Sequence, residues 1–281
     1  MKLFVTGGTG FVGTHFLNQA LDKGYQVIAQ RRPGSLPRLP LLEEPIWIDR
    51  ALDQDFNELA GCDAVVHLAS HTPNPPYAPL DECLYWNVFA TVRLLQQAAA
   101  QGVKNIIVAG TCFEYGDAAE GLDFVHPLTE MRPSLSYPIS KAAATTACLG
   151  LSRNLGLRLQ VLRIFQVFGE GEAANRFWPA LRTAALQGHN FAMSAGTQVR
   201  DFIPVSEVGR QLMQALSFEG VEPGKPHIRN VGTGYGQSLL AFASNWWSHW
   251  GATGQLQPGT VGLRSGELPR LVANVEDRHI C

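Results

Sequence analysis

Short apolar runs and longer amphipathic segments alternate over the first two-thirds of the 281-residue chain. The runs are rich in Val, Ile and Leu and are bounded by glycine or polar residues, which is typical of buried parallel strands. The segments between several of them have helical spacing of apolar residues and end near a glycine. This alternation predicts an α/β fold with a doubly wound parallel sheet. The expected strands are 2–6, 26–30, 46–48, 64–68, 105–109 and 158–164, and the expected helices are 11–22, 84–101 and 137–155.

The last third of the chain loses this rhythm, because glycines, prolines and tryptophans are scattered through it. Helices are expected at 177–187, 207–218 and 239–250, and a further strand at 227–231. We therefore expect a cofactor-binding domain over residues 1–165 and a smaller substrate-binding lobe over 166–281. Parts near 200–215 are expected to return to the first domain.

Composition and charge narrow the class of protein. Hydrophobic residues make up 46% and charged residues 16%, and the net charge is −2, which argues against disorder, nucleic-acid binding and a membrane-surface role. The first apolar run is too short for a signal peptide or a membrane span, so we expect a cytoplasmic protein. The cysteines are odd in number and lack C-x-x-C spacing, which disfavours disulfides and a metal site. They are Cys62, Cys83, Cys112, Cys148 and Cys281.

A glycine-rich loop, Thr6-Gly7-Gly8-Thr9-Gly10-Phe11-Val12-Gly13, stands between the first expected strand and the first expected helix. Glycine there lets backbone N–H groups approach a pyrophosphate, and a third glycine lets the helix pack closely on the strand. The strand–loop–helix context is what such a motif requires. The loop predicts a Rossmann-type dinucleotide site.

The end of the second strand bears on the choice of dinucleotide. NAD-binding units carry an acid there for the ribose 2′-hydroxyl, whereas this chain reads Gln30-Arg31-Arg32. Arginine suits a 2′-phosphate. The sequence therefore favours NADP(H) over NAD(H), although both arginines could also be solvated loop residues.

Tyr137 and Lys141 lie one helical turn apart and would share a face of the expected helix. An ammonium near a phenol lowers the pKa of the phenol, and the phenol can then exchange a proton with a substrate oxygen. The pair predicts an acid–base site beside the nicotinamide.

With these motifs in place, the chain resembles the extended short-chain dehydrogenase/reductases, the NAD-dependent epimerase/dehydratase family acting on nucleotide-linked sugars. The motifs keep the family's order through most of the chain. They are the glycine loop, His67-Leu68-Ala69, Asn87, Gly110 to Gly116, Tyr137 to Lys141, Arg163 to Gly169, Arg200-Asp201-Phe202-Ile203 and Asn230 to Gly234.

The resemblance implies roles for individual residues. Thr111 takes the place of the catalytic Ser/Thr beside Tyr137 and Lys141, and Arg200 resembles the arginine that meets the substrate's phosphates, with an ion pair to Asp201 as the alternative. Residues expected to bind the cofactor are Gly7, Thr9, Gly10, Phe11, Val12, Arg31, Arg32, Asp49, Leu68, Ala69, Asn87, Tyr137, Lys141 and Ile164. Residues expected to bind the substrate are His71, Thr111, Cys112, Phe113, Gln166, Arg176 and Arg200.

The two residues after Thr111 restrict the reaction. Dehydratases of this family carry Asp-Glu there, whereas this chain has Cys112 and Phe113, so dehydration is not expected. The remaining hypotheses are an NADPH-dependent 4-ketoreductase of nucleotide-activated deoxysugars, favoured by Gln30-Arg31-Arg32, and an NAD-dependent 4-epimerase. A cofactor-sensing protein without catalysis is a third hypothesis, disfavoured by the presence of Thr111, Tyr137 and Lys141.

The chain also departs from the family pattern. Pro204-Val205-Ser206-Glu207 stands where His-Val-Asp-Asp is usual, and the chain ends soon after 268–274, so the substrate lobe is expected to be trimmed or covered by another chain. The resemblance implies a homodimer formed through the helices that carry Asn87 and Tyr137.

Overall fold

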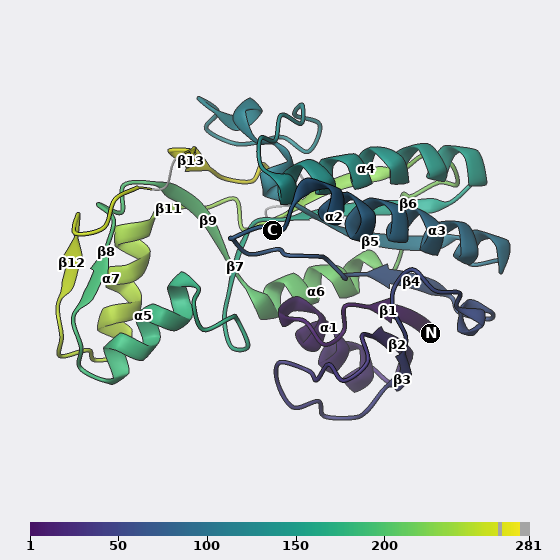
Figure 1. Ribbon diagram of the computed structural model, residues 1–281, viewed down its shortest axis with the longest axis horizontal. Helices are drawn as coiled ribbons and strands as arrows, with labels where there is room; N and C mark the ends of the chain where they lie inside the picture. The colour runs from purple at the N-terminus through teal and green to yellow at the C-terminus, as the bar shows by residue number, and fades with distance from the viewer. Residues whose placement is uncertain (264–265, 276–281) are drawn as a thin grey trace.

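The computed structural model describes residues 1–263 and 266–275. Seven parallel strands form its main sheet in the order β3-β2-β1-β4-β5-β6-β10. A Rossmann-type α/β fold is thus confirmed (Figure 1). The strands are β1 (Lys2–Thr6), β2 (Gln26–Arg31), β3 (Ile46–Asp49), β4 (Ala64–His67), β5 (Asn105–Thr111), β6 (Arg158–Ile164) and β10 (His227–Val231).

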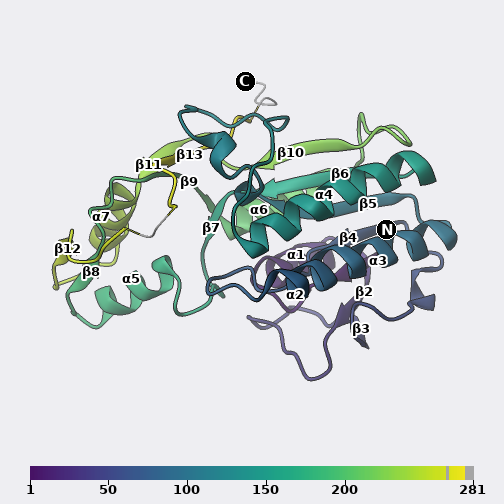
Figure 2. The same ribbon diagram turned by 45° about the horizontal axis from the view of Figure 1, so that its top comes forward.

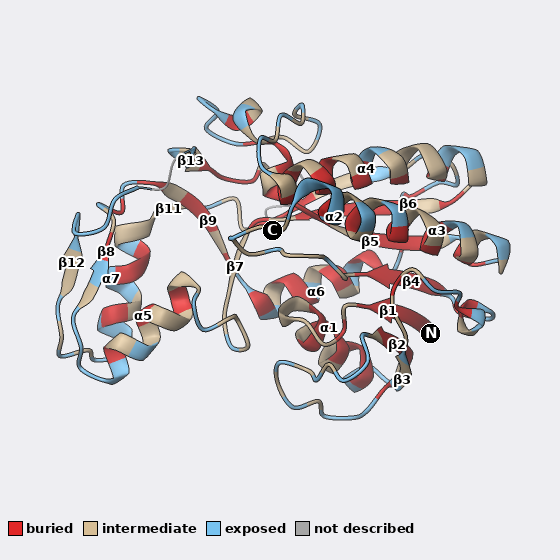
Figure 3. Ribbon diagram, viewed as in Figure 1, coloured by how far each residue is buried: buried red, intermediate tan, exposed pale blue. Residues whose placement is uncertain are grey.

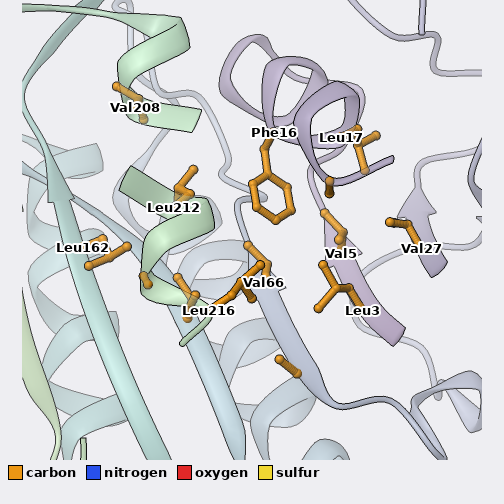
Figure 4. Packing of buried hydrophobic residues seen from close by; sticks show 14 of the residues in the cluster. Leu3, Val5, Phe16, Leu17, Val27, Val66, Leu162, Val208, Leu212 and Leu216 are labelled. Carbon is orange, nitrogen blue, oxygen red and sulfur yellow. The ribbon is translucent and has the colours of Figure 1, made fainter. Parts of the chain in front are cut away.

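Helices cover both faces of this sheet, as Figure 2 shows. On one face α1 (Phe11–Asp22) packs against α6 (Val205–Ala215), and Phe16 meets Leu212 above Val5 and Val66 of the sheet (Figure 4). On the other face lie α3 (Ala90–Ala100) and α4 (Ser136–Leu155). Both interiors are apolar, which explains why the central strands read as continuous hydrophobic runs.

The prediction of one regular α-helix over residues 84–101 is wrong for residues 85–89. The chain forms α2 (Leu80–Leu84), then the π-helical turn η2 (Tyr85–Phe89), and only then α3. A π turn displaces the side chains that follow it from regular helical spacing, and such turns are frequent at functional sites.

A smaller lobe stands at the side of the main sheet, to the left in Figure 1. Helices α5 (Phe177–Leu186) and α7 (Leu239–His249) pack there on a pair formed by β8 (Phe191–Met193) and β12 (Leu256–Pro258). The buried faces of α5 and α7 turn toward each other in Figure 3. A second sheet connects the lobes through β7 (Gln166–Phe168), β9 (Val199–Pro204), β11 (Gly236–Ser238) and β13 (Arg270–Leu271).

The chain crosses between the lobes more than once. After β9 it returns to the main sheet, where α6 packs on α1 and β10 pairs with β6. Strand β10 therefore lies in the large domain, although the 166–281 division assigned its residues to the small lobe. Short 3₁₀ turns complete the described elements: η1 (Asn57–Leu59), η3 (Cys112–Glu114) and η4 (Asp117–Ala119).

Candidate active site

A cavity of about 460 Å³ opens at the carboxyl ends of the main-sheet strands, around the point between β1 and β4 where the strand order reverses. Ligands of doubly wound sheets bind at this point. Most residues expected at the site line this cavity: Gly7, Thr9, Gly10, Phe11, Val12, Arg31, Arg32, Leu68, Ala69, His71, Asn87, Thr111, Phe113, Tyr137, Lys141, Ile164, Gln166 and Arg176.

The glycine loop forms one end of the cavity and leads into the N-terminus of α1. Gly7 has a φ of +72°, and a Cβ there would press on the backbone of Ala69. A Cβ on Gly13 would collide with the Gly7 carbonyl. No side chain caps α1 at Gly10, so its first N–H groups are available to an anion. The loop therefore fits a dinucleotide pyrophosphate.

Arg31 lines the cavity, but its charge is already paired. Its guanidinium donates to both oxygens of Asp49, at 2.7 and 3.3 Å, and stacks 4.6 Å above the Trp47 ring. The pairing raises the pKa of Arg31 and lowers that of Asp49. Asp49, expected to bind cofactor, does not line the cavity and holds Arg31 instead.

Arg200 and Cys112, both expected to bind substrate, also lie outside the cavity lining. Arg200 is buried and pairs with Glu267 at 3.1 Å. The alternative pairing of Arg200 with Asp201 is wrong, because the Asp201 carboxylate accepts hydrogen bonds from Thr233 and the Gly234 N–H. Cys112 is 2% exposed, and burial raises the pKa of its thiol to about 12.

Tyr137 and Lys141 stand in the first turns of α4, both lining the cavity and both nearly buried. The Lys141 ammonium donates to the Ala109 carbonyl at 2.8 Å, which fixes it beneath the end of β5. Burial lowers the pKa of Lys141 and raises that of Tyr137. The expected lowering of the Tyr137 pKa by Lys141 is not seen here, because burial is the largest influence on the phenol and raises its pKa.

Thr111 ends β5 and faces the same cavity. Its backbone N–H donates to the Glu114 carboxylate at 2.8 Å, and that carboxylate also accepts from Thr145 and from the Arg163 guanidinium, at 2.8 and 2.9 Å. Glu114 is fully buried. The carboxylate therefore fixes the turn after Thr111 and does not face the cavity.

Asn87 lies within the π turn η2 and is buried against the cavity wall. Its amide donates to the Ser140 hydroxyl at 2.9 Å, and its carbonyl accepts the His71 N–H at 2.7 Å. Asn87 thus fastens the loop after β4 to helix α4, next to Tyr137.

Several cavity residues were absent from the sequence-based prediction. Gln30 stands where an acid is usual in NAD-binding units, and its side-chain amide donates to the Arg50 carbonyl at 2.6 Å in the cavity wall. Its position at the end of β2 was the available signal. The other missed residues include Ala51, Leu52, Ser70, Pro73, Asn74, Trp86 and Val167.

A known protein family matches most of the chain. The family described as "NAD dependent epimerase/dehydratase family" matches residues 3–232. The chain belongs to this family. Its members are NAD-dependent enzymes of the extended short-chain dehydrogenase/reductase type, which confirms the resemblance drawn from the motifs.

The individual relatives share less than a third of their residues with this chain. UDP-arabinose 4-epimerase 1 of Arabidopsis thaliana is 29% identical over 85% of this chain, which spans 65% of that protein's length. UDP-glucose 4-epimerase of Corynebacterium glutamicum is 27% identical over 98% of this chain and 88% of its own. The solved structure of MoeE5 with UDP-glucuronic acid and NAD has a TM-score of 0.81 at 28% identity, covering 98% of this chain and 90% of that one.

Other kinds of site are not found in the part of the chain that the structure describes. Within residues 1–263 and 266–275 no cluster of His, Cys, Asp or Glu could hold a metal ion, and none of the helices there is long and apolar enough to cross a membrane. The four cysteines in this range are free and buried.

Proposed function

We propose that this protein is an NAD-dependent 4-epimerase of UDP-sugars. The observation that carries the proposal is the convergence of Thr111, Tyr137 and Lys141 on the cavity that the glycine loop opens. The relatives named as UDP-arabinose and UDP-glucose 4-epimerases support this activity over 4-ketoreduction. Homodimerisation and a cytoplasmic location remain expectations of the family resemblance.

The residues of the chain suit the proton transfers of this reaction. Burial favours the neutral phenol of Tyr137 in the protein without cofactor. The positive charge of a bound nicotinamide would favour the phenolate, which takes the proton of the sugar C4 hydroxyl while the Thr111 hydroxyl donates to the same oxygen. NAD held by the glycine loop, with Lys141 beside it, would supply the hydride acceptor and donor that inversion at C4 requires. After the keto-sugar has rotated to present its opposite face, Tyr137 gives its proton back to the C4 oxygen. Sugar and cofactor are thus both restored, and only the C4 configuration changes.

Dehydration is disfavoured by the residues after Thr111. Phe113 lines the cavity but carries no exchangeable proton, and the thiol of Cys112 is buried with its pKa raised to about 12. Glu114 is the nearest carboxylate in sequence, but it is held by Thr111, Thr145 and Arg163 away from the cavity.

NAD rather than NADP is the cofactor that we propose. The preference for NADP(H), expected from Gln30-Arg31-Arg32, is not supported by the relatives, whose structures hold NAD. The guanidinium of Arg31 is committed to Asp49, so a 2′-phosphate would have to displace a carboxylate. Binding constants of both dinucleotides test this, and tighter binding of NADP would contradict it.

Incubation with UDP-glucose, and separately with UDP-arabinose, tests the activity itself. We expect C4 epimers to form without added coenzyme, and Tyr137→Phe to slow their formation by about 10²-fold or more. Stoichiometric NADPH consumption with a 4-keto-sugar, without interconversion of UDP-sugars, would instead support the reductase. Binding of NAD with neither reaction would support the non-catalytic hypothesis.

A further inference from the structure

The guanidinium of Arg176 lies between the cavity and a buried carboxylate. Arg176 lines the cavity and directly precedes α5, at the end of the segment that leads from β7 into the small lobe (Figure 1). Its Nε donates to Oε1 of Glu172 at 3.3 Å. Within the described residues its side chain has no other partner, so both of its Nη groups are available to an anion in the cavity.

Glu172 is an unusual partner for an arginine, because one of its oxygens is left without a donor. Its side chain is 6% exposed and does not line the cavity. Oε2 is buried and finds no hydrogen-bond partner in the part of the chain that the structure describes. A buried, unpartnered carboxylate oxygen is costly, and the cost falls when the group is protonated.

The backbone holds the two side chains close together. The Glu172 N–H donates to the Gly169 carbonyl at 3.2 Å, and the Arg176 N–H donates to the Ala173 carbonyl at 2.8 Å. The Arg176 carbonyl accepts the Ala180 N–H at 3.1 Å, in the first turn of α5. Glu172 therefore stays beside Arg176 when a ligand enters the cavity.

Other charged groups approach this segment but are directed elsewhere. Glu170 pairs with Arg182 at 3.4 Å, the His15 ring bonds the Glu170 carbonyl at 2.8 Å, and Arg38 lies beside Gly171. Among the charged side chains of the described residues, Arg176 is the one that acts on Glu172. Burial raises the pKa of Glu172 to about 7, against the opposing influence of Arg176 and a weaker one of the Gly169 backbone.

A diphosphate bound to Arg176 would change this balance. Arginine binds phosphate oxygens in pairs through its fork of N–H donors. The diphosphate and the Glu172 carboxylate would then share one guanidinium, and like charges at such a distance disfavour the ionised carboxyl. A proton taken up by Glu172 removes the repulsion.

We infer that Glu172 is the resting counter-ion of Arg176, and that it takes up a proton when the diphosphate of a nucleotide sugar binds the same guanidinium. Substrate affinity then falls as pH rises through neutrality. The inference rests on the proposed function, because that function supplies the nucleotide sugar.

Titration calorimetry of the NAD-loaded protein with UDP-glucose, in two buffers of different ionisation enthalpy, counts the protons taken up on binding. The diphosphate of a UDP-sugar has no proton that titrates near neutral pH, so the uptake belongs to the protein. Near pH 7 about half of the free protein already carries the proton on Glu172. We therefore expect an uptake of about half a proton per UDP-glucose and a Kd that rises about threefold per pH unit.

Glu172→Gln imitates the protonated carboxyl and should lack this uptake. At about pH 8 it should bind UDP-glucose roughly tenfold more tightly than the wild type, because the wild-type carboxyl must first gain a proton. A residue needed only for folding would instead give weaker binding when replaced. Glu170→Gln is the matched control, since Glu170 is 59% exposed and pairs with Arg182, and it should behave as the wild type.

The wild-type measurement alone can overturn the inference, if UDP-glucose binds without proton uptake or does not bind at all. Equal uptake by Glu172→Gln, or the same loss of uptake in Glu170→Gln, would also overturn it. If the uptake depends on Glu172 but the wild-type protein forms no UDP-galactose, the inference stands and the proposed function fails. Epimerisation without proton uptake would leave the proposed function in place and remove the inference.

Discussion

At the scale of single residues, the Tyr137 hydroxyl is the group that the proposed reaction depends on most. Tyr137→Phe removes that oxygen and leaves the ring packed beside Tyr77. We expect kcat to fall about 10²- to 10⁴-fold, the usual contribution of a positioned acid–base group, while NAD stays bound. Rate measurements and cofactor content of the purified variant check this. Unchanged turnover would remove Tyr137 from the mechanism.

The buried carboxylate of Glu114 should matter for stability. Glu114→Gln would leave the Arg163 guanidinium, itself buried and 4.5 Å above the Tyr115 ring, without its counter-charge. Breaking a buried pair in this way costs about 3–5 kcal/mol of unfolding free energy, measurable by urea denaturation. Glu130→Gln is the control, because the Glu130–Arg132 pair is exposed and should leave the midpoint unchanged. Equal midpoints for both variants would contradict the structural role of Glu114.

Residue roles that depend on local motifs could be predicted from the sequence, whereas long-range pairings could not. The glycine loop, Thr111 and the Tyr137–Lys141 pair all line the cavity. Asp49 pairs with Arg31 through the register of β2 and β3, and Glu267 reaches Arg200 across 67 positions. Neither strand register nor the packing of the lobes can be read from a short motif, so neither ion pair was predicted.

At the scale of elements, the junction of β1 with α1 leaves no room for a side chain at Gly13. Gly13→Ala would push a methyl group into the Gly7 carbonyl and separate the helix from the pyrophosphate loop. We expect the purified variant to lose its NAD. Gly150→Ala in α4 is the control, since a Cβ there meets nothing within 4 Å and should add about 0.5–1 kcal/mol of stability. Full NAD retention by Gly13→Ala would contradict the fit of the loop to the cofactor.

The segment between β7 and α5 should give stability an unusual dependence on pH. Burial raises the pKa of Glu172 to about 7, against the opposing effect of Arg176 at 3.3 Å. The folded state therefore binds a proton that the unfolded chain releases near pH 4.5, and stability falls as pH rises from about 4.5 to 7. Glu172→Gln should abolish this part of the slope, on the order of 3 kcal/mol. An identical slope in both proteins would refute it.

Elements were predicted where one periodicity ran through the whole segment. The pattern placed α1 at 11–22 and β6 at 158–164, as the structure has them. It failed at the α2–η2–α3 segment, because a π turn changes the spacing only locally and apolar residues continue on both sides of it. The same turn holds Asn87 at the cavity.

At the scale of the whole molecule, the two lobes are joined by β7 and β9, which pair in parallel between the main sheet and the small lobe. Arg176 from the small-lobe side lines the same cavity as the glycine loop. A nucleotide sugar bound there would contact both lobes. Arg176→Ala is therefore expected to raise KM for UDP-sugars more than it lowers kcat, and steady-state kinetics check this. A fall in kcat alone, with KM unchanged, would contradict this placement.

The most direct test of epimerisation follows one hydrogen atom. UDP-glucose with deuterium at C4 should give UDP-galactose that retains the deuterium at C4, without added coenzyme, because the hydrogen taken to the nicotinamide is the one returned. Mass spectrometry and NMR of the product measure this. Absence of UDP-galactose, together with conversion of a 4-keto-sugar at the expense of added NADPH, would contradict the account.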